Sequence, residues 1–469
     1  MTEYRKESDL LGEASIPKDA YWGIHTYRAI DNFPVSSYKI DKDFIKGFGL
    51  VKLACALVNK DLEYIESPMV DYIIDAAQEM ADNKLDKHII VDAFQGGAGT
   101  STNMNVNEVI ANRALEIAGK EKGYYKYIDP IEGVNLHQST NDTYPTALKV
   151  AIVYKLRELE KGLVSLQESF QRKEKEFSDV VKVGRTQLMD AVLITLGREF
   201  AAYAEAIGRD RWRVYKCEER IRVINLGGTA VGTGLTAPRK FIFAVSEKLR
   251  ELTGFGLARA EDLLENTQNL DAFVEISGIL KTNATNLIKV SNDLRLMNSG
   301  PNAGFGEIML PEVQAGSSIM PGKVNPVICE MVAQVGYRVL ANDVAINNCV
   351  ANGQLELNQF MPLIAHSLLE SLELLKNSNN IFAFKAIDGL VPCKENINNQ
   401  VNNSLATLTA LLPVVGYKEA TEIAKKAKDS GKSILDIVIE DNIISKEDYD
   451  MLTSPEMVCA LGHSRRIKD

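Results

Sequence analysis

The chain is acidic and long enough for several domains. Its 469 residues carry 53 Lys and Arg against 63 Asp and Glu, which gives a net charge of −10, and 45% of them are hydrophobic. A hydrophobic content this high can fill a large core, which excludes wholesale disorder. The acidic balance argues against a protein that binds nucleic acid through a basic face. The length is compatible with about three domains.

Six cysteines are scattered along the chain without a CxxC pair. This spacing favours buried free thiols in a reducing compartment over a disulfide scaffold or a zinc knuckle. The chain begins with polar residues, and no apolar run approaches the roughly 20 residues of a membrane span. No histidine falls in an HExxH pattern, so a zinc hydrolase has no support. We therefore predict a cytoplasmic protein with no membrane partner, no nucleic-acid partner and no metal site.

The first part of the chain predicts a small, mostly helical domain over residues 1–141. It begins with an irregular segment that contains Pro17, Gly23 and Pro34. Apolar periodicity then predicts three helices, over residues 43–60, 68–81 and 103–118.

Five long stretches of helical periodicity follow. From Leu148 to Phe170 the apolar residues recur every three or four positions, which is typical of a long helix that packs against others. The same spacing continues over residues 200–224, 273–294, 328–346 and 364–375. Helices of roughly 20–30 residues exceed the mean of about 11–12 and predict an elongated bundle over residues 142–397. Helices this long and apolar also predict assembly with other chains.

Shorter helices, interrupted at Gly416 and Gly431, predict a small C-terminal helical domain over residues 398–469. The connections between the long helices are rich in Gly, Pro and small polar residues. Connections this long are more often functional than idle, and they lie at residues 180–194, 226–240, 298–327 and 351–362.

Two polar segments stand at predicted helix starts. In Gly96–Ser101 three glycines let the backbone approach a ligand, and two hydroxyls lie near amide groups that favour anions. A simple turn with a helix cap explains this segment equally well. His137–Asp142 contains consecutive hydrogen-bonding side chains ahead of the first long helix. It is compatible with a capping segment and with an anion site.

Two further segments carry cations. Arg185, within Gly184–Asp190, is suited to clamping a carboxylate or to pairing with Asp190, and structural pairing is the commoner fate of such an arginine. The segment Gly316–Pro326 superficially resembles a phosphate loop, but its glycines are one residue too far apart for GxxxxGK[ST], and Val324 stands in place of the hydroxyl. What remains is a Gly/Pro loop with two hydroxyls, one ammonium and one amide, which suits a small dicarboxylate.

This loop resembles the signature loop of the aspartase/fumarase superfamily, whose members eliminate across a C–C bond of a succinyl-type substrate and release fumarate. Segments similar to the family's other motifs precede it in the expected order, at 96–101, 138–142 and 184–190. The resemblance covers the chain from about residue 7 to the mid-450s. It implies an all-α, three-domain chain whose central long-helix bundle assembles into a tetrameric multi-helix core.

Within the superfamily, the details resemble aspartate ammonia-lyases more than class II fumarases. Gln95–Ser101, Ser139–Asn141 and Val327 are aspartase-like, whereas Cys329-Glu330 is similar to the fumarase continuation. The resemblance thus implies reversible elimination of ammonia from L-aspartate to give fumarate, with class II fumarate hydratase as the alternative. A catalytically dead structural protein and a dicarboxylate-binding module are further alternatives. The intact Ser317, Lys323 and Asn325 argue against the structural protein, and the binding module is the weaker alternative of the two.

The resemblance also implies roles for individual residues. Ser317 would act as an oxyanion base that removes the C3 proton and produces an aci-carboxylate intermediate. The substrate-binding residues would be Thr100, Ser139, Thr140, Asn141, Thr186, Ser318, Lys323 and Asn325, with Gln187, Ser101 and Glu330 expected behind them. No cofactor is implied, and Mg²⁺ activation, which some aspartases show, is compatible with these residues. The site would be shared between three chains of a homotetramer.

Overall fold

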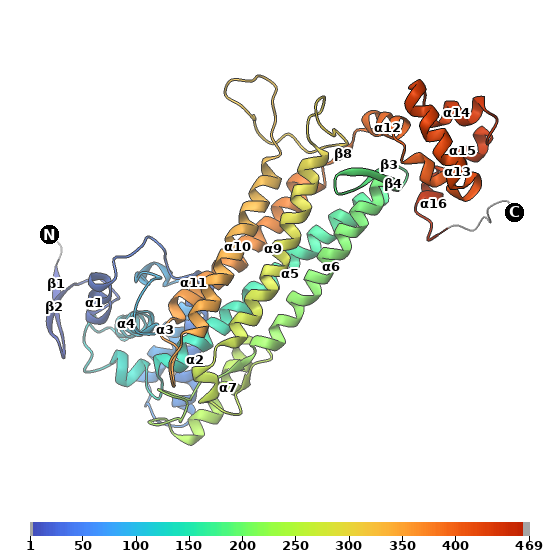
Figure 1. The fold of residues 1–469 in the computed structure, drawn as a ribbon. Coiled ribbons are helices and arrows are strands. Elements are labelled where there is room, and N and C mark those ends of the chain that lie inside the picture. The colour runs from blue at the N-terminus through green and yellow to red at the C-terminus, as the bar shows by residue number, and fades with distance from the viewer. Residues whose placement is uncertain (1–2, 463–469) are drawn as a thin grey trace. The chain divides into compact units, whose positions relative to one another are not determined.

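The computed structural model describes residues 3–462, and Figure 1 shows the course of the chain. The chain divides into two compact units. The first contains the chain up to Glu160 together with Trp212–Thr282 and Arg338–Leu375. The second contains Lys161–Arg211, Asn283–Tyr337 and the chain from Lys376 on. The three-domain division of the sequence stays a prediction.

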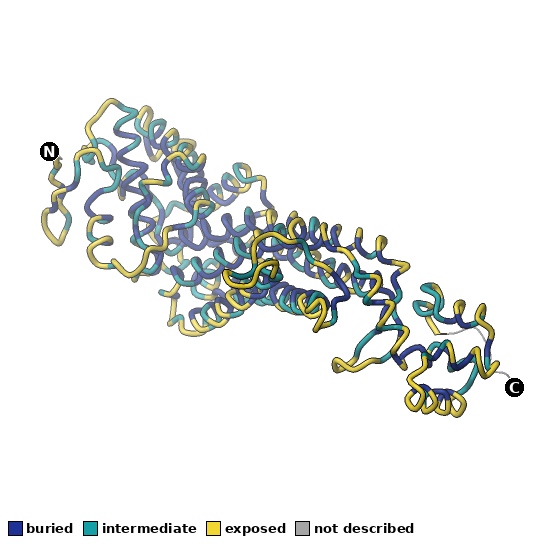
Figure 2. Tube along the Cα trace, turned by 90° about the horizontal axis from the view of Figure 1, so that it is seen from above, coloured by how far each residue is buried: buried dark blue, intermediate teal, exposed yellow. Residues whose placement is uncertain are grey.

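Five long helices contribute residues to both units, and they confirm the all-α prediction. They are α5 (Thr140–Glu176), α6 (Leu196–Ile221), α9 (Asp271–Met297), α10 (Val327–Ala351) and α11 (Met361–Phe382). Buried residues recur turn by turn along them (Figure 2), as the spacing of three and four residues requires. Among residues 3–462, none of the helices is both long enough and apolar enough to cross a bilayer.

The first long helix begins earlier than its apolar pattern predicts, because Pro145 lies inside α5 rather than ahead of it. Proline has no N–H and leaves the carbonyl four residues before it without its helical partner. Here that carbonyl belongs to Asn141, and the side-chain amide of Asn225 donates to it at 3.0 Å. A side chain from a distant segment thus allows the helix to extend back to Thr140.

The first unit is built around α2 (Lys42–Asp61), which is buried on nearly all sides. Its neighbours approach at glycines. A Cβ on Gly47 would lie 2.4 Å from the carbonyl oxygen of Ala147 in α5, and one on Gly49 would lie 2.3 Å from the backbone nitrogen of Ala81. The other helices of this unit are α1 (Ile24–Asn32), α3 (Met69–Ala81), α4 (Thr100–Ile117), α7 (Arg239–Thr253) and α8 (Glu265–Gln268). The predicted helices over 43–60, 68–81 and 103–118 are confirmed, the last with an earlier start.

Short strands interrupt the helical pattern of the first unit. The segment predicted to be irregular contains an antiparallel hairpin of β1 (Tyr4–Asp9) and β2 (Gly12–Pro17), so that prediction was wrong for these residues. The strand signal is weak in the sequence, because most residues of β1 are charged and only Ala14 and Ile16 are apolar and buried in β2. A parallel pair, β5 (Val223–Ile224) and β6 (Ala258–Arg259), joins α6 to the segment that follows α7.

The second unit has an aromatic core. The ring of Phe170 in α5 lies 6.0 Å from that of Phe200 in α6 and 6.2 Å from that of Phe382 in α11. The connection at 180–194 forms a hairpin of β3 (Val181–Thr186) and β4 (Met189–Thr195). A smaller pair, β7 (Ile308–Met309) and β8 (Val391–Pro392), lies within the same unit.

The end of the described chain is a cluster of helices (Figure 1). They are α12 (Lys394–Asn403), α13 (Thr407–Ser430), α14 (Ile434–Glu440), α15 (Lys446–Leu452) and α16 (Pro455–Val458). The interruptions predicted at Gly416 and Gly431 are confirmed, since both have positive φ: the first kinks α13 and the second ends it. Leu411, Ile437 and Leu452 belong to the core that α13, α14 and α15 share.

Replacing Gly47 by Ala should lower the free energy of unfolding by about 1–3 kcal/mol, because the new Cβ meets the α5 backbone, which cannot yield locally. Gly278→Ala in α9 is the matched control. Its Cβ meets nothing within 4 Å. Removing a glycine from a helix interior should raise the free energy of unfolding by about 0.5–1 kcal/mol. Chemical denaturation measures both changes, and equal effects would contradict the close packing of α2 on α5.

Candidate active site

The Gly-rich segment forms a tight turn into α4. Residues 97–99 all have positive φ, a conformation that suits glycine. The Oε1 atom of Gln95 accepts hydrogen bonds from the backbone N–H and the hydroxyl of Thr102, both at 3.0 Å. Thr100 is the first residue of α4, is exposed, and donates its hydroxyl to the Gly97 carbonyl at 2.8 Å. The turn therefore presents Thr100 at a helix N-terminus, where anions are favoured.

The predicted residues at 139–141 lie beside the start of α4. The buried Oγ1 of Thr140 accepts a hydrogen bond from Nδ2 of Asn103 at 3.1 Å. The Oγ of Ser139 accepts from the backbone N–H of Asn141 at 3.2 Å, which is a local capping contact. Nδ2 of Asn141 donates to the carbonyl of Ala230 at 2.7 Å. The structure thus brings three predicted substrate-binding residues together with the turn that carries the fourth.

A buried carboxylate without a predicted role supports this segment. One oxygen of Asp142 accepts the backbone N–H of Ser139 at 3.0 Å, and the other accepts those of Gly227 and Thr229 at 3.1 and 3.0 Å. Burial raises the pKa of Asp142 to about 6, although these hydrogen bonds oppose the shift. The carboxylate ties the polar segment to the connection at 226–240.

A buried lysine completes this support. Nζ of Lys52, in α2, donates to Oδ1 of Asn135 and to Oε1 of Gln138, both at 2.9 Å. Burial lowers the pKa of Lys52 to about 7. Gln138 and Asp142 therefore face inward and hold nearby groups in place by hydrogen bonds. Part of the polar segment His137–Asp142 is thus structural. The signal that could have found Lys52 was a lone cation in the middle of an apolar helix.

The β3–β4 hairpin presents two predicted residues at its tip. Thr186 pairs with Met189 across a two-residue turn at Gln187 and Leu188, which have φ of 55° and 63°. Positive φ at both positions is the type I′ geometry of tight hairpins. For residues with a side chain this backbone is strained, and such strain concentrates at functional sites. Thr186 and Gln187 are both exposed.

Arg185 forms a structural ion pair, which was the commoner of its two predicted roles. The predicted partner, Asp190, was wrong. Its Nη1 lies 2.7 Å from Oε1 of Glu307, and Nζ of Lys182 lies 3.0 Å from the second carboxylate oxygen. Glu307 is fully buried, and a buried carboxylate needs hydrogen-bond donors or close cationic partners, here the two cations. Asp190 instead accepts the hydroxyl of Ser404 at 2.6 Å. Glu307 thus fixes the hairpin to the segment that leads into the signature loop.

The signature loop, residues 316–326, is closed on itself. The N–H of Gly316 donates to the carbonyl of Lys323 at 2.8 Å, and Nδ2 of Asn325 donates to the carbonyl of Gly316 at 2.8 Å. A Cβ on Gly316 would lie 2.5 Å from the Lys323 oxygen, so this closure requires glycine. Ser318 and Lys323 are exposed. Within residues 3–462, the Lys323 ammonium forms no ion pair.

Ser317 lies in a turn within this loop. Its Oγ accepts two backbone hydrogen bonds, from the N–H of Ile319 at 3.2 Å and from the N–H of Met320 at 3.0 Å. Two N–H donors aimed at one hydroxyl oxygen favour negative charge on that oxygen. The residue is half-buried. This geometry suits an oxygen that must carry charge.

The residues expected behind the substrate are more dispersed. Glu330 lies in the first turn of α10, where its carboxylate is 4.0 Å from the guanidinium of Arg295. Ser101 is half-buried in the first turn of α4. In the described part of the chain, no three His, Cys, Asp or Glu side chains are grouped so as to hold a metal ion.

The predicted site residues divide between the two units. The first unit holds Thr100, Ser101, Ser139, Thr140 and Asn141. The second holds Thr186, Gln187, Ser317, Ser318, Lys323, Asn325 and Glu330. Their assignment to one site stays a prediction.

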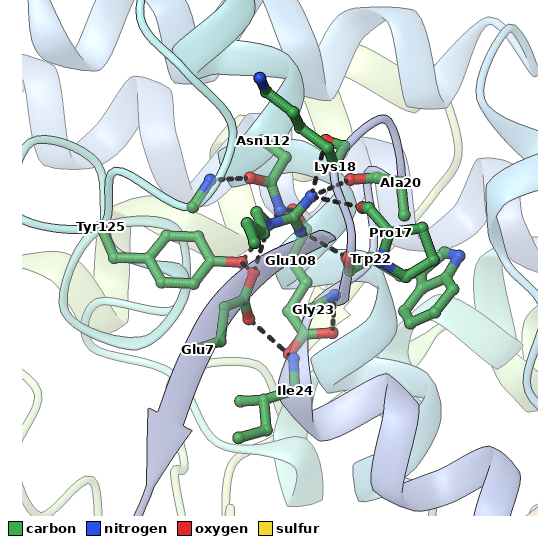
Figure 3. Close-up of polar contacts among 12 residues, drawn as sticks. Glu7, Pro17, Lys18, Ala20, Trp22, Gly23, Ile24, Glu108, Asn112 and Tyr125 are labelled. Carbon is green, nitrogen blue, oxygen red and sulfur yellow. Dashed lines mark hydrogen bonds and ion pairs between the residues drawn. The ribbon is translucent and has the colours of Figure 1, made fainter. Parts of the chain in front are cut away.

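A buried polar network fixes the N-terminal segment against α4 (Figure 3). Glu108 of α4 accepts the backbone N–H of Gly23 at 2.8 Å and the hydroxyl of Thr26 at 2.6 Å, and burial raises its pKa. Glu7 of β1 accepts the N–H of Ile24 at 2.8 Å. A Cβ on Gly23 would lie 2.6 Å from one Glu7 oxygen, so the two carboxylates close around a glycine. These bonds anchor the helix whose first turn carries Thr100.

Two family descriptions match the chain. A family described as "Lyase" matches residues 12–341, and one described as "Fumarase C C-terminus" matches residues 408–459. The chain belongs to the aspartase/fumarase superfamily. The predicted family is confirmed.

Similar proteins of this superfamily extend over almost the whole chain. Aspartate ammonia-lyase from Bacillus sp. is 44% identical over 454 residues and 97% of each chain. The enzyme of that name from Helicobacter pylori strain J99 is 44% identical, over 99% of this chain and 100% of its own. A crystal structure of fumarate lyase:delta crystallin from Brucella melitensis, bound to cobalt, superposes with a TM-score of 0.93 at 43% identity, covering 96% of this chain and 98% of that one. Recombinant class II fumarase from Schistosoma mansoni superposes with a TM-score of 0.90 at 33% identity, covering 98% and 100%.

Replacing Asp142 by Asn should change how stability depends on pH. Because burial raises the folded-state pKa from 3.8 to about 6, the folded chain holds this proton more tightly than the unfolded chain does. The wild-type protein should therefore lose about 3 kcal/mol relative to the variant as the pH rises from about 4 through about 6. Denaturant unfolding of both proteins across this range measures the difference. If the free energies of unfolding of both proteins changed with pH in the same way, the raised pKa of Asp142 would be contradicted.

Proposed function

We propose that this chain is an aspartate ammonia-lyase, which converts L-aspartate reversibly to fumarate and ammonia. The observation that carries the proposal is the pair of backbone N–H groups on the Ser317 oxygen, in a loop whose sequence matches the superfamily signature. Curated relatives that are 42–44% identical over nearly the whole chain carry this name, which favours the reaction over fumarate hydration.

The chemical step begins at C3 of the substrate. The Ser317 oxyanion removes the C3 proton, and the electron pair left on carbon spreads onto the neighbouring carboxylate as an aci-anion. The C2–N bond then breaks, the double bond of fumarate forms, and the nitrogen leaves as ammonia with its bonding electron pair. The proton on Ser317 passes to solvent. The free-energy barrier comes mainly from the extra negative charge that forms on the carboxylate. Hydrogen-bond donors aimed at that group therefore supply most of the rate enhancement.

The proposed binding residues supply those donors. The hydroxyls of Thr140, Thr186 and Ser139 hold the substrate carboxylates. The Thr100 hydroxyl joins them by turning away from the Gly97 carbonyl, to which it donates without substrate. Ser318 and Lys323 of the signature loop hold the α-carboxylate and fix its orientation. The proposal takes support from the exposure of the Lys323 ammonium.

Asn141 and Asn325 each use one amide hydrogen on a backbone carbonyl. An amide group carries two such hydrogens. In the proposal, Oδ1 of Asn141 accepts a hydrogen bond from the substrate amino group, or its second amide hydrogen donates to a carboxylate. The second amide hydrogen of Asn325 donates to the α-carboxylate.

Gln187 distinguishes the proposed reaction from fumarate hydration. Its side chain cannot titrate. A departing ammonium group leaves as neutral ammonia and needs no strong acid, whereas departing hydroxide benefits from one. The turn that places Gln187 at the hairpin tip therefore suits the ammonia-lyase reaction, with Ser101 and Glu330 supporting the site from behind.

We propose further that the chain acts in the cytoplasm as a homotetramer, in which three chains contribute to each site. Large apolar side chains on two of the long helices are exposed in the single chain, which supports burial against other copies. They are Trp212 at 64% and Tyr215 at 59% exposure in α6, and Tyr337 at 55% and Val344 at 61% in α10.

The purified protein should form fumarate from L-aspartate and not from L-malate. The ultraviolet absorbance of fumarate measures both reactions directly. Formation from malate alone would show a hydratase, and no turnover of either substrate would contradict the lyase proposal.

Replacing Ser317 by Ala should lower kcat for aspartate about 100- to 10 000-fold, because the base is lost. KM should change little, and the fold should be retained, since the hydroxyl contacts only loop backbone. Ser430→Ala, at the exposed end of α13, is the matched control and should keep full activity. A Ser317→Ala variant with near wild-type kcat would remove this residue from the base role.

A further inference from the structure

A hollow of about 950 Å³, open to solvent, lies beside α7 in the first unit. Four cations line it: Arg239, Lys240, Arg250 and Arg259. Among its described lining residues, Glu247 alone is acidic, and its carboxylate lies 3.3 Å from the guanidinium of Arg250. The hollow therefore keeps an excess of positive charge in a chain whose net charge is −10.

An exposed aromatic ring holds two of these cations near each other. The guanidinium carbons of Arg239 and Arg259 lie 5.8 and 4.8 Å from the centroid of the Phe243 ring. Arg259 is fixed further, because its Nη1 donates to the carbonyl of Ala260 at 2.9 Å. Within residues 3–462, neither of these two arginines forms an ion pair. Like charges are thus gathered without an internal counterion, an arrangement that favours an external anion.

A buried hydroxyl in the same wall also lacks a partner. Ser246 lines the hollow and is only 4% exposed. Its Oγ makes no hydrogen bond with any residue in the described part of the chain. A buried polar atom without a partner costs free energy, and nearly all such atoms in proteins are satisfied. An oxygen of a bound ligand would satisfy this one.

We infer that the hollow binds an anion that carries a chain of two or more phosphate groups. Guanidinium groups match phosphate oxygens with paired hydrogen bonds. A phosphate chain carries enough negative charge to balance the three excess cations, and the volume suits a ligand of nucleotide size. A small dicarboxylate would fill only a fraction of it. This inference does not depend on the proposed lyase reaction.

Calorimetric titration of the full-length protein with inorganic triphosphate tests the inference, with ATP as a parallel arm. Saturable binding of about one triphosphate per chain is expected. The double variant Arg239→Gln/Arg259→Gln should weaken binding roughly 100-fold, about tenfold for each lost charge-assisted contact. Ser246→Ala, a near-isosteric change that should leave the fold intact, is expected to weaken it severalfold. Equal affinity for the two ligands would identify the phosphate chain as sufficient, and tighter binding of ATP would identify a nucleotide; both outcomes support the inference.

The matched control is Lys6→Gln/Lys425→Gln, which removes the same charge from exposed lysines outside the hollow. It should bind triphosphate as the wild type does. The inference is overturned if no saturable binding occurs, if the Arg239→Gln/Arg259→Gln protein binds as tightly as wild type, or if the control loses as much affinity. Aspartate turnover plays no part in this measurement, so failure of the lyase proposal would leave the result unaffected.

Discussion

Buried charges bonded to backbone groups or to opposite charges hold three of the polar segments of this chain. Asp142 accepts three backbone N–H groups at the start of α5, and Glu108 fixes the N-terminal segment to α4. Glu307, with Arg185 and Lys182, secures the hairpin that carries the strained turn. Breaking such an arrangement leaves an uncompensated buried charge, which is far more costly than losing a surface ion pair. The segments with predicted substrate contacts are thereby preorganised before any ligand binds.

Preorganisation matters because the proposed reaction places extra negative charge on a carboxylate. Donors that had to reorient during the reaction would stabilise this charge less, because reorientation itself costs free energy. Thr100 stands at the start of α4 with its hydroxyl donating to the Gly97 carbonyl, and the oxygen of Ser317 already accepts two N–H groups. Both groups depend on glycine-rich backbone, because a Cβ on Gly316 would prevent closure of the signature loop.

The two proposed sites offer chemically different surroundings to a negative ligand. The predicted catalytic segments are rich in hydroxyl, amide and backbone donors with a single exposed ammonium, which suits small carboxylates. The hollow beside α7 relies on clustered guanidinium groups around Phe243, which suits a larger and more highly charged anion. Because the net charge of the chain is −10, each of these cationic or donor-rich segments is a local exception.

The amino-acid sequence by itself determined the long helices, the breaks at Gly416 and Gly431, the superfamily and the segments that carry the candidate site. These follow from local periodicity, from backbone freedom at glycine and from a specific motif. Each of these signals lies within a short stretch of neighbouring residues. Only the tertiary structure decided the partner of Arg185, the hydrogen bond that lets α5 pass Pro145, and the roles of Lys52 and Asp142. Each depends on groups far apart in the chain, such as Asn225 for the carbonyl of Asn141, and no local pattern encodes which distant groups will meet.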